Sequence, residues 1–76
     1  MEKIQMDYHL TEREMSVIFC LAQGFTNEEI ANKLHISVHT VKAHLEAIYD
    51  KLGVSNRVQA AIKAVLSNLI DLNSLV

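Results

Sequence analysis

Hydrophobic residues recur along this chain every three or four positions, which is the spacing of one face of an α-helix. Successive stretches with this spacing predict helices over about residues 11–23, 27–34, 38–51 and 56–68. Each stretch is short and is bounded by residues that commonly start or stop helices. We therefore expect an all-α fold with four helices over residues 10–76, and an N-terminal tail or linker over residues 1–9.

The starts of the first three helices carry capping signals. Thr11 and Glu14 have the spacing of a capping box, in which each side chain accepts a hydrogen bond from the backbone N–H of the other residue. Thr26 and Glu29 repeat this spacing. Ser37 is the expected cap of the third helix. The agreement of these local signals favours a single helical bundle.

Helix ends are signalled as well. Gly24 and Gly53 follow the first and third helices, where a residue with positive φ commonly ends a helix. His35 lies in the turn between the second and third helices, and histidine is among the non-glycine residues that tolerate positive φ best. The fourth helix begins at a cap that is either Ser55 or Asn56.

The fourth helix is apolar over much of its surface. We assign its large apolar residues to the core: Val58, Ile62, Val65, Leu66 and Leu69. The other face carries Ala60 and Ala64, one turn apart, and these alanines with Ser67 form the predicted dimer face, on which a second copy of the helix would pack. The alternative is that the alanines only supply helix propensity on a solvated surface. Part of the apolar segment 69–76 is expected to pack back on the domain.

Residues 27–46 have the layout of a helix-turn-helix, with a short helix, a tight turn and a longer second helix. In this motif the second helix enters the major groove of DNA. Its outward face here is formed by His39, Lys42, Ala43, Glu46 and Ala47. The small side chains at Ala43 and Ala47 would let another surface approach the backbone closely, although an ordinary solvated face is the alternative.

Composition limits the functional classes. The chain has 76 residues, of which 50% are hydrophobic, with no proline and a single cysteine, Cys20. This composition fits one small helical domain, and Cys20 is expected to be a buried, unpaired thiol in a reducing compartment. No apolar run approaches the roughly 20 residues that span a bilayer, and no leader sequence is recognisable. We expect a cytoplasmic protein without a membrane partner.

The net charge of −2 is low for a DNA-binding domain, because lysine and arginine neutralise the phosphates. Acidic residues crowd the first fourteen positions, whereas most of the cations come later: Lys33, Lys42, Lys51, Arg57 and Lys63. We expect modest DNA affinity for each copy, with a dimer or an attached domain supplying the rest.

In combination these motifs resemble the DNA-binding domain of LuxR/NarL/FixJ-type transcription regulators. The resemblance covers about residues 10–65 and rests on the segments LTERE, AQGFTNEEIA, ISVHTVKAHL and KLGVSNRVQA. It implies a four-helix domain whose third helix reads the major groove and whose fourth helix supports dimerisation on DNA. Each segment alone would be a weak signal.

The resemblance also implies roles for single residues. Lys42 is similar to a position that contacts DNA, while Thr40, Arg57 and the N-terminal ends of the second and fourth helices resemble phosphate-contacting positions. His44 lies between core and surface, so we favour a packing or phosphate-adjacent role for it. The predicted DNA-binding residues are Asn27, Lys33, Ser37, His39, Thr40, Lys42, Ala43, His44, Glu46, Ala47 and Arg57.

Glu46 departs from those relatives that carry a second basic residue on the reading face. Glutamate repels phosphate but can accept a hydrogen bond from cytosine N4 in the major groove. Our hypothesis is that Glu46 contributes to base choice rather than to affinity. Ala43 is a weaker candidate for contact with a thymine methyl group.

Two other functional classes are the alternatives to DNA binding. A helix-turn-helix module can bind proteins such as RNA polymerase or another regulator, and the acidic net charge favours this alternative; a salt titration of DNA binding separates the two. An enzyme is not expected, because the chain has no glycine-rich phosphate loop and no recognisable nucleophile–base pair. Neither a cofactor nor a metal site is expected, since the Ser37 cap separates His35 from His39.

The expected partners are therefore double-stranded DNA, a second copy of the chain through the fourth helix, and RNA polymerase. Seventy-six residues leave no room for a receiver or ligand-binding domain. We expect either an excised fragment or a small stand-alone regulator.

Overall fold

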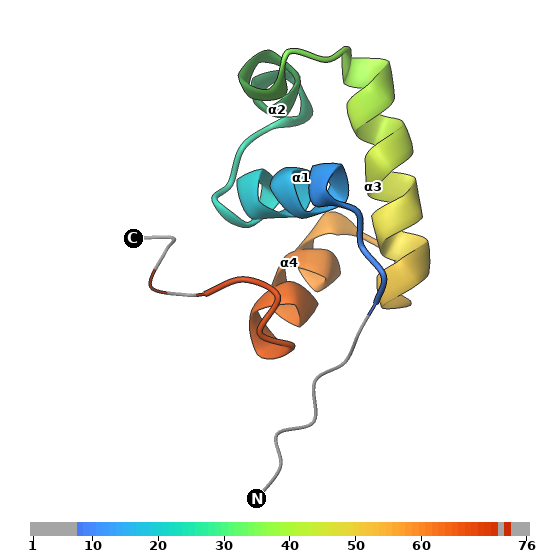
Figure 1. The fold of residues 1–76 in the computed structure, drawn as a ribbon, viewed down its shortest axis with the longest axis vertical. Coiled ribbons are helices and arrows are strands. Elements are labelled where there is room, and N and C mark those ends of the chain that lie inside the picture. The colour runs from blue at the N-terminus through green and yellow to red at the C-terminus, as the bar shows by residue number, and fades with distance from the viewer. Residues whose placement is uncertain (1–7, 72, 74–76) are drawn as a thin grey trace, which may run out of the picture.

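The computed structural model describes residues 8–71 and 73. It contains four helices in this part of the chain, α1 (Glu12–Ala22), α2 (Asn27–Leu34), α3 (Val38–Leu52) and α4 (Arg57–Leu66), and no strand. Figure 1 shows α3 along one side, with α1 and α4 packed against it and α2 near the N-terminal end of α3. The all-α prediction is confirmed; the predicted ends of α2 coincide with the observed ones, and those of the other helices lie within two residues of them.

The predicted helix caps are present. Thr11 Oγ1 accepts from the Glu14 N–H at 3.0 Å, and Glu14 Oε1 accepts from the Thr11 N–H at 2.9 Å. Thr26 and Glu29 make the equivalent pair of hydrogen bonds at 3.1 and 2.8 Å. These side chains satisfy N–H groups that the first turn of a helix leaves without intrahelical partners.

The remaining caps follow the same rule. Ser37 Oγ accepts from the Thr40 N–H at 3.0 Å at the start of α3. At the start of α4, Asn56 Oδ1 accepts from the Gln59 N–H at 2.9 Å, so Asn56 is the cap.

The turn between α2 and α3 depends on His35, which has φ of 59° and ψ of 45°. This left-handed conformation lets the Ile36 N–H donate to the carbonyl of Ala31 at 3.0 Å, which closes the last turn of α2. The chain then enters α3 after only a short break. The prediction of positive φ at His35 is confirmed.

The core contains apolar side chains from all four helices and from the segment after α4. Its buried members are Val17, Ile18, Cys20, Leu21, Ile30, Ala31, Val41, Leu45, Ile48, Leu52, Ala60, Ala64 and Ile70. Burial raises the pKa of the Cys20 thiol, which makes the thiolate less accessible near neutral pH.

Both ends of the described chain pack on this core. Tyr8 is half-buried against it, and Ile70 is 4% exposed. The expectation that part of segment 69–76 packs back is thus met at Leu69 and Ile70. Residues 1–7 of the predicted tail, and residues 72 and 74–76, lie outside the described residues.

Most of α4 is turned the other way from our prediction, although Leu69, after the helix, packs on the core as expected. Ala60 and Ala64 are completely buried, whereas Val58, Ile62 and Leu66 are 64%, 54% and 76% exposed. Because α4 packs against both α1 and α3, small side chains on its inner face let the helices approach closely. Ala60 and Ala64 are therefore core residues and cannot form a dimer face.

Candidate nucleic-acid interface

The side of α3 turned away from the core carries the predicted reading residues. His39, Lys42, Ala43 and Glu46 are exposed, and Ala47 is half-buried. The buried residues Val41, Leu45 and Ile48 hold the opposite side of α3 against the domain. The helix is thus fixed by one face and presents the other to solvent.

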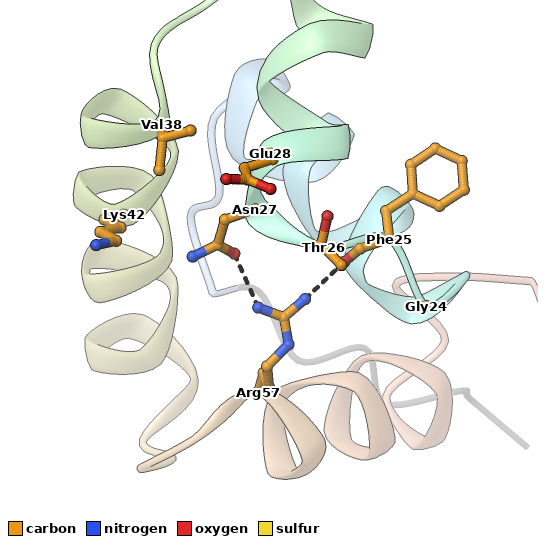
Figure 2. A pocket seen from close by; sticks show the side chains of 8 residues that line it. All are labelled: Gly24, Phe25, Thr26, Asn27, Glu28, Val38, Lys42 and Arg57. Atoms are coloured by element: carbon orange, nitrogen blue, oxygen red, sulfur yellow. Dashed lines mark hydrogen bonds between the residues drawn. The ribbon is translucent and has the colours of Figure 1, made fainter.

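An open cleft of about 480 Å³ lies between the start of α2, the first turns of α3 and the start of α4 (Figure 2). It is lined by Gly24, Phe25, Thr26, Asn27, Glu28, Val38, Lys42 and Arg57. A smaller cleft of about 200 Å³ lies next to it along α3, lined by Asn27, Lys42, Leu45, Glu46, Tyr49 and Arg57. The side chains shared by both clefts come from three different helices: Asn27, Lys42 and Arg57.

Arg57 joins the start of α4 to the start of α2. Its Nη1 donates to Asn27 Oδ1 at 2.8 Å, and its Nη2 donates to the carbonyl oxygen of Phe25 at 2.7 Å (Figure 2). The side chain is half-buried. We predicted Arg57 as a phosphate contact from the sequence, but both terminal nitrogens of its guanidinium group already have protein acceptors.

The charges around the clefts are mixed. Lys42 and Arg57 are cationic, while Glu28 lines the larger cleft and Glu46 the smaller one. The backbone N–H groups at the start of α2 add a partial positive charge, which favours an anion there. This combination can bind an anion such as a phosphate, although with few full positive charges.

The other predicted residues lie outside the two clefts. Lys33 is exposed, with its Nζ 5.8 Å from the centroid of the Phe25 ring. Ser37 Oγ and Thr40 Oγ1 are hydrogen-bonded at 2.9 Å at the start of α3. His44 is half-buried on α3, and its charge contributes to lowering the pKa of Glu14 on α1.

Seven cleft residues were not predicted as part of the site: Gly24, Phe25, Thr26, Glu28, Val38, Leu45 and Tyr49. Val38 and Tyr49 belong to the apolar side of α3, yet both are half-buried and line a cleft. Glu28 follows the cap of α2 and was not assigned a role. The sequence offers only a weak signal for such cleft residues, namely a position at the edge of an apolar stripe.

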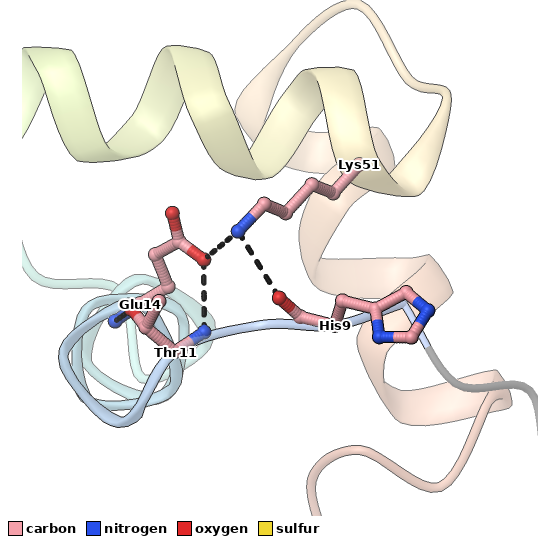
Figure 3. Close-up of polar contacts among 4 residues, drawn as sticks. All are labelled: His9, Thr11, Glu14 and Lys51. Carbon is pink, nitrogen blue, oxygen red and sulfur yellow. Dashed lines mark hydrogen bonds and ion pairs between the residues drawn. The ribbon is translucent and has the colours of Figure 1, made fainter.

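A second polar cluster joins the start of α1 to the end of α3 (Figure 3). Glu14 is 5% exposed, and its Oε1 accepts from Lys51 Nζ at 2.7 Å as well as from the Thr11 N–H. Lys51 Nζ also donates to the carbonyl oxygen of His9 at 3.1 Å. All of these acceptors are internal, so the cluster holds elements together rather than forming a ligand site.

Comparison with known proteins assigns the family. Residues 8–64 match the sequence profile of the bacterial regulatory proteins of the luxR family. The chain belongs to the luxR family. Similar proteins include the response regulator protein VraR of Staphylococcus aureus and of Staphylococcus epidermidis, each 49% identical over 62 residues, which cover 82% of this chain and 30% of the relative.

A solved structure gives the same assignment. The crystal structure of the response regulator ChrA of a heme-sensing two-component system is similar to this chain with a TM-score of 0.79 and 44% sequence identity, over 90% of this chain and 33% of that one. The chain therefore spans about a third of the length of these luxR-family relatives.

Membership in the luxR family makes this chain a helix-turn-helix domain for DNA binding in transcription regulation. Among the residues that the structure describes, no three His, Cys, Asp or Glu side chains are grouped so that they could hold a metal ion. Within the same residues, no helix is both long and apolar enough to cross a membrane.

Proposed function

We propose that this luxR-family domain binds DNA sequence-specifically with α3 in the major groove, as a dimer on paired half-sites. The observation that carries the proposal is the exposed outer face of α3 beside a cleft lined with hydrogen-bond donors. An α-helix fits the major groove, and a cleft that favours anions beside it suits the sugar-phosphate backbone. The DNA-binding unit comprises residues 10–76 in this proposal.

Lys42 is the residue in the best position to contact DNA. It is exposed on α3 and lines both clefts, so its ammonium group can reach a phosphate or the acceptors of a base edge. Ala43, one position further along α3, is small and exposed and can approach a thymine methyl group. Glu46 lines the smaller cleft, where its carboxylate can accept from cytosine N4.

The dimer contact in this proposal is the exposed apolar stripe of Val58, Ile62 and Leu66 on α4. These residues are spaced one helical turn apart, so that two copies of the stripe can pack in a symmetric contact. Ser67 lies beside the stripe, in an apolar cleft of about 360 Å³ that is also lined by Ile62 and Leu66. The burial of these side chains by a second copy would remove a large apolar surface from water.

We expect Lys42→Ala to abolish specific DNA binding without unfolding the domain, because Lys42 is exposed and makes no core contact. The target is first obtained by selecting bound sequences from a random DNA pool, and the affinity of each variant is then measured on that target. Recovery of a sequence with half-site symmetry would support the dimer.

Arg13→Ala is the control, since it removes one positive charge from an exposed position of α1, away from the two clefts and from the apolar stripe of α4. Unchanged affinity in a folded Lys42→Ala protein would contradict the proposed orientation of α3. Failure of the unmodified protein to bind any DNA at low salt would instead favour the protein-binding alternative, with RNA polymerase or another regulator as partner.

A further inference from the structure

The hydrogen bonds of Arg57 fix the orientation of the Asn27 side chain. A guanidinium group has only donors, so the atom of the Asn27 carboxamide that faces Nη1 must be the oxygen. The distance of 2.8 Å between Nη1 and Oδ1 agrees with a direct hydrogen bond. The NH₂ group of Asn27 is then forced to the other side of the carboxamide.

That other side faces α3. Figure 2 shows the Asn27 nitrogen directed toward the helix that carries Lys42, and both residues line both clefts. This NH₂ group donates to none of the residues that the structure describes. Two donor N–H bonds therefore point into the cleft, at the start of α2, whose first N–H groups have no intrahelical partners.

The second hydrogen bond of Arg57 holds the backbone at the same place. Nη2 donates to the carbonyl oxygen of Phe25, which precedes the Thr26 cap of α2. The start of α2 and the side chain of its first residue are thus fixed by one planar group. Lysine has a single nitrogen, so it lacks the two separate, coplanar donor nitrogens with which arginine holds these two acceptors in a fixed geometry.

We propose that Arg57 is a positioning residue for DNA binding, which holds the Asn27 NH₂ group toward a phosphate of the bound DNA rather than binding that phosphate itself. Without Arg57 the carboxamide can rotate, and its oxygen, which would repel a phosphate, can face the cleft instead. This inference rests on the proposed function, in which the clefts beside α3 receive the DNA backbone.

The test is a double-mutant cycle on the selected DNA target, at a temperature at which circular dichroism shows every variant folded. Arg57→Lys keeps the positive charge but removes the planar pair of donor nitrogens, so we expect about a tenfold loss of DNA affinity. Asn27→Ala should lose a similar amount. The double variant should bind about as well as either single one, because the second change removes nothing further.

Two results would overturn the inference while leaving the proposed function intact. The first is an Arg57→Lys protein with the affinity of the unmodified one, as expected for a direct phosphate contact or a purely structural role. The second is a double variant whose fold-loss of DNA affinity equals the product of the fold-losses of the two single variants. No DNA binding by the unmodified protein would overturn both proposals.

Asn27→Asp tests the same point even if Arg57→Lys does not fold. Aspartate still accepts from Arg57 but has no NH₂ group, so we expect a folded protein with at least about a tenfold loss of affinity. Asn32→Asp is the matched control, since it adds the same charge at an exposed position of α2 outside the clefts. Equal losses in these two variants would overturn the inference.

Discussion

At the scale of the single residue, Glu14 has two structural roles. It is the reciprocal member of the capping box of α1, and it also pairs with Lys51 at the end of α3. Burial by itself would raise the pKa of Glu14. The hydrogen bonds from Lys51 and from the Thr11 N–H, together with the charges of Lys51 and His44, outweigh burial and hold the pKa below its ordinary value.

This pKa shift makes the stability of the domain depend on pH. A carboxyl group with a lowered folded-state pKa stabilises the fold above its unfolded pKa, which is about 4.3 for glutamate. The contribution is lost as the pH falls through the lower, folded-state pKa. At neutral pH, we expect Glu14→Gln to lower the free energy of unfolding by about 1–2 kcal/mol.

The measurement is urea unfolding of both proteins from neutral to acidic pH, in which the difference should shrink as the pH falls below about 4. Glu12→Gln is the control, because Glu12 is an exposed acidic residue in the same turn of α1. A stability difference that stays constant down to pH values of about 2 would show that the carboxylate charge of Glu14 does not stabilise the fold.

At the scale of an element, α4 shows where periodicity is ambiguous. Apolar residues occupy nearly every direction around this helix, from Val58 to Leu66. Such a helix has no single face that hydrophobicity alone assigns to the core. The close packing of α4 against α1 and α3 determines which face is buried, since only the side with Ala60 and Ala64 has side chains small enough to fit. The large side chains are left in solvent.

We expect Ile62→Gln to weaken cooperative binding to paired half-sites while binding to one half-site stays unchanged. Ile62 is 54% exposed, so its replacement by another helix-forming residue should barely alter the stability of one copy. Gel-shift titrations on a paired and a single half-site, with thermal unfolding of the protein, measure both effects.

Ala64→Leu provides the contrast on the same helix. Ala64 is completely buried, and the added methyl groups should overpack the core at a cost of about 1–3 kcal/mol. If Ile62→Gln left cooperativity intact, the stripe on α4 would not be the dimer contact.

At the scale of the whole molecule, charge sets the strength of DNA binding. The chain has seven lysine and arginine residues against nine aspartate and glutamate residues. Of these cations, Lys51 is paired with the Glu14 carboxylate, whereas Arg57 is held by neutral oxygens of Asn27 and Phe25 and keeps its charge. Because carboxylates outnumber cations in the chain, a single copy should bind weakly and a dimer should bind much more tightly.

The salt dependence of binding tests this point. The slope of log K against log salt concentration is about −0.9 for each phosphate neutralised on duplex DNA. We expect a shallow slope on one half-site and a slope about twice as steep on a paired site, because two copies contact twice as many phosphates. Anisotropy titrations at several salt concentrations give both slopes. Equal slopes on the two targets would contradict binding as a dimer.

The features predicted correctly from the sequence depend on residues close together in the chain. Capping boxes join positions three apart, the left-handed turn needs only His35 and its neighbours, and the outward face of α3 follows from helical periodicity. Local backbone geometry and side-chain spacing are sufficient to specify them.

The remaining features depend on how distant segments meet. The hydrogen bond from Arg57 to Asn27 joins residues 30 apart, and that from Lys51 to Glu14 joins residues 37 apart. The inner face of α4 likewise depends on the space that α1 and α3 leave for it. The sequence by itself thus determined the helices, their ends and the face of α3 that is exposed to solvent. Only the tertiary structure decided which side of α4 is buried and that Arg57 holds Asn27, because packing between distant elements sets both.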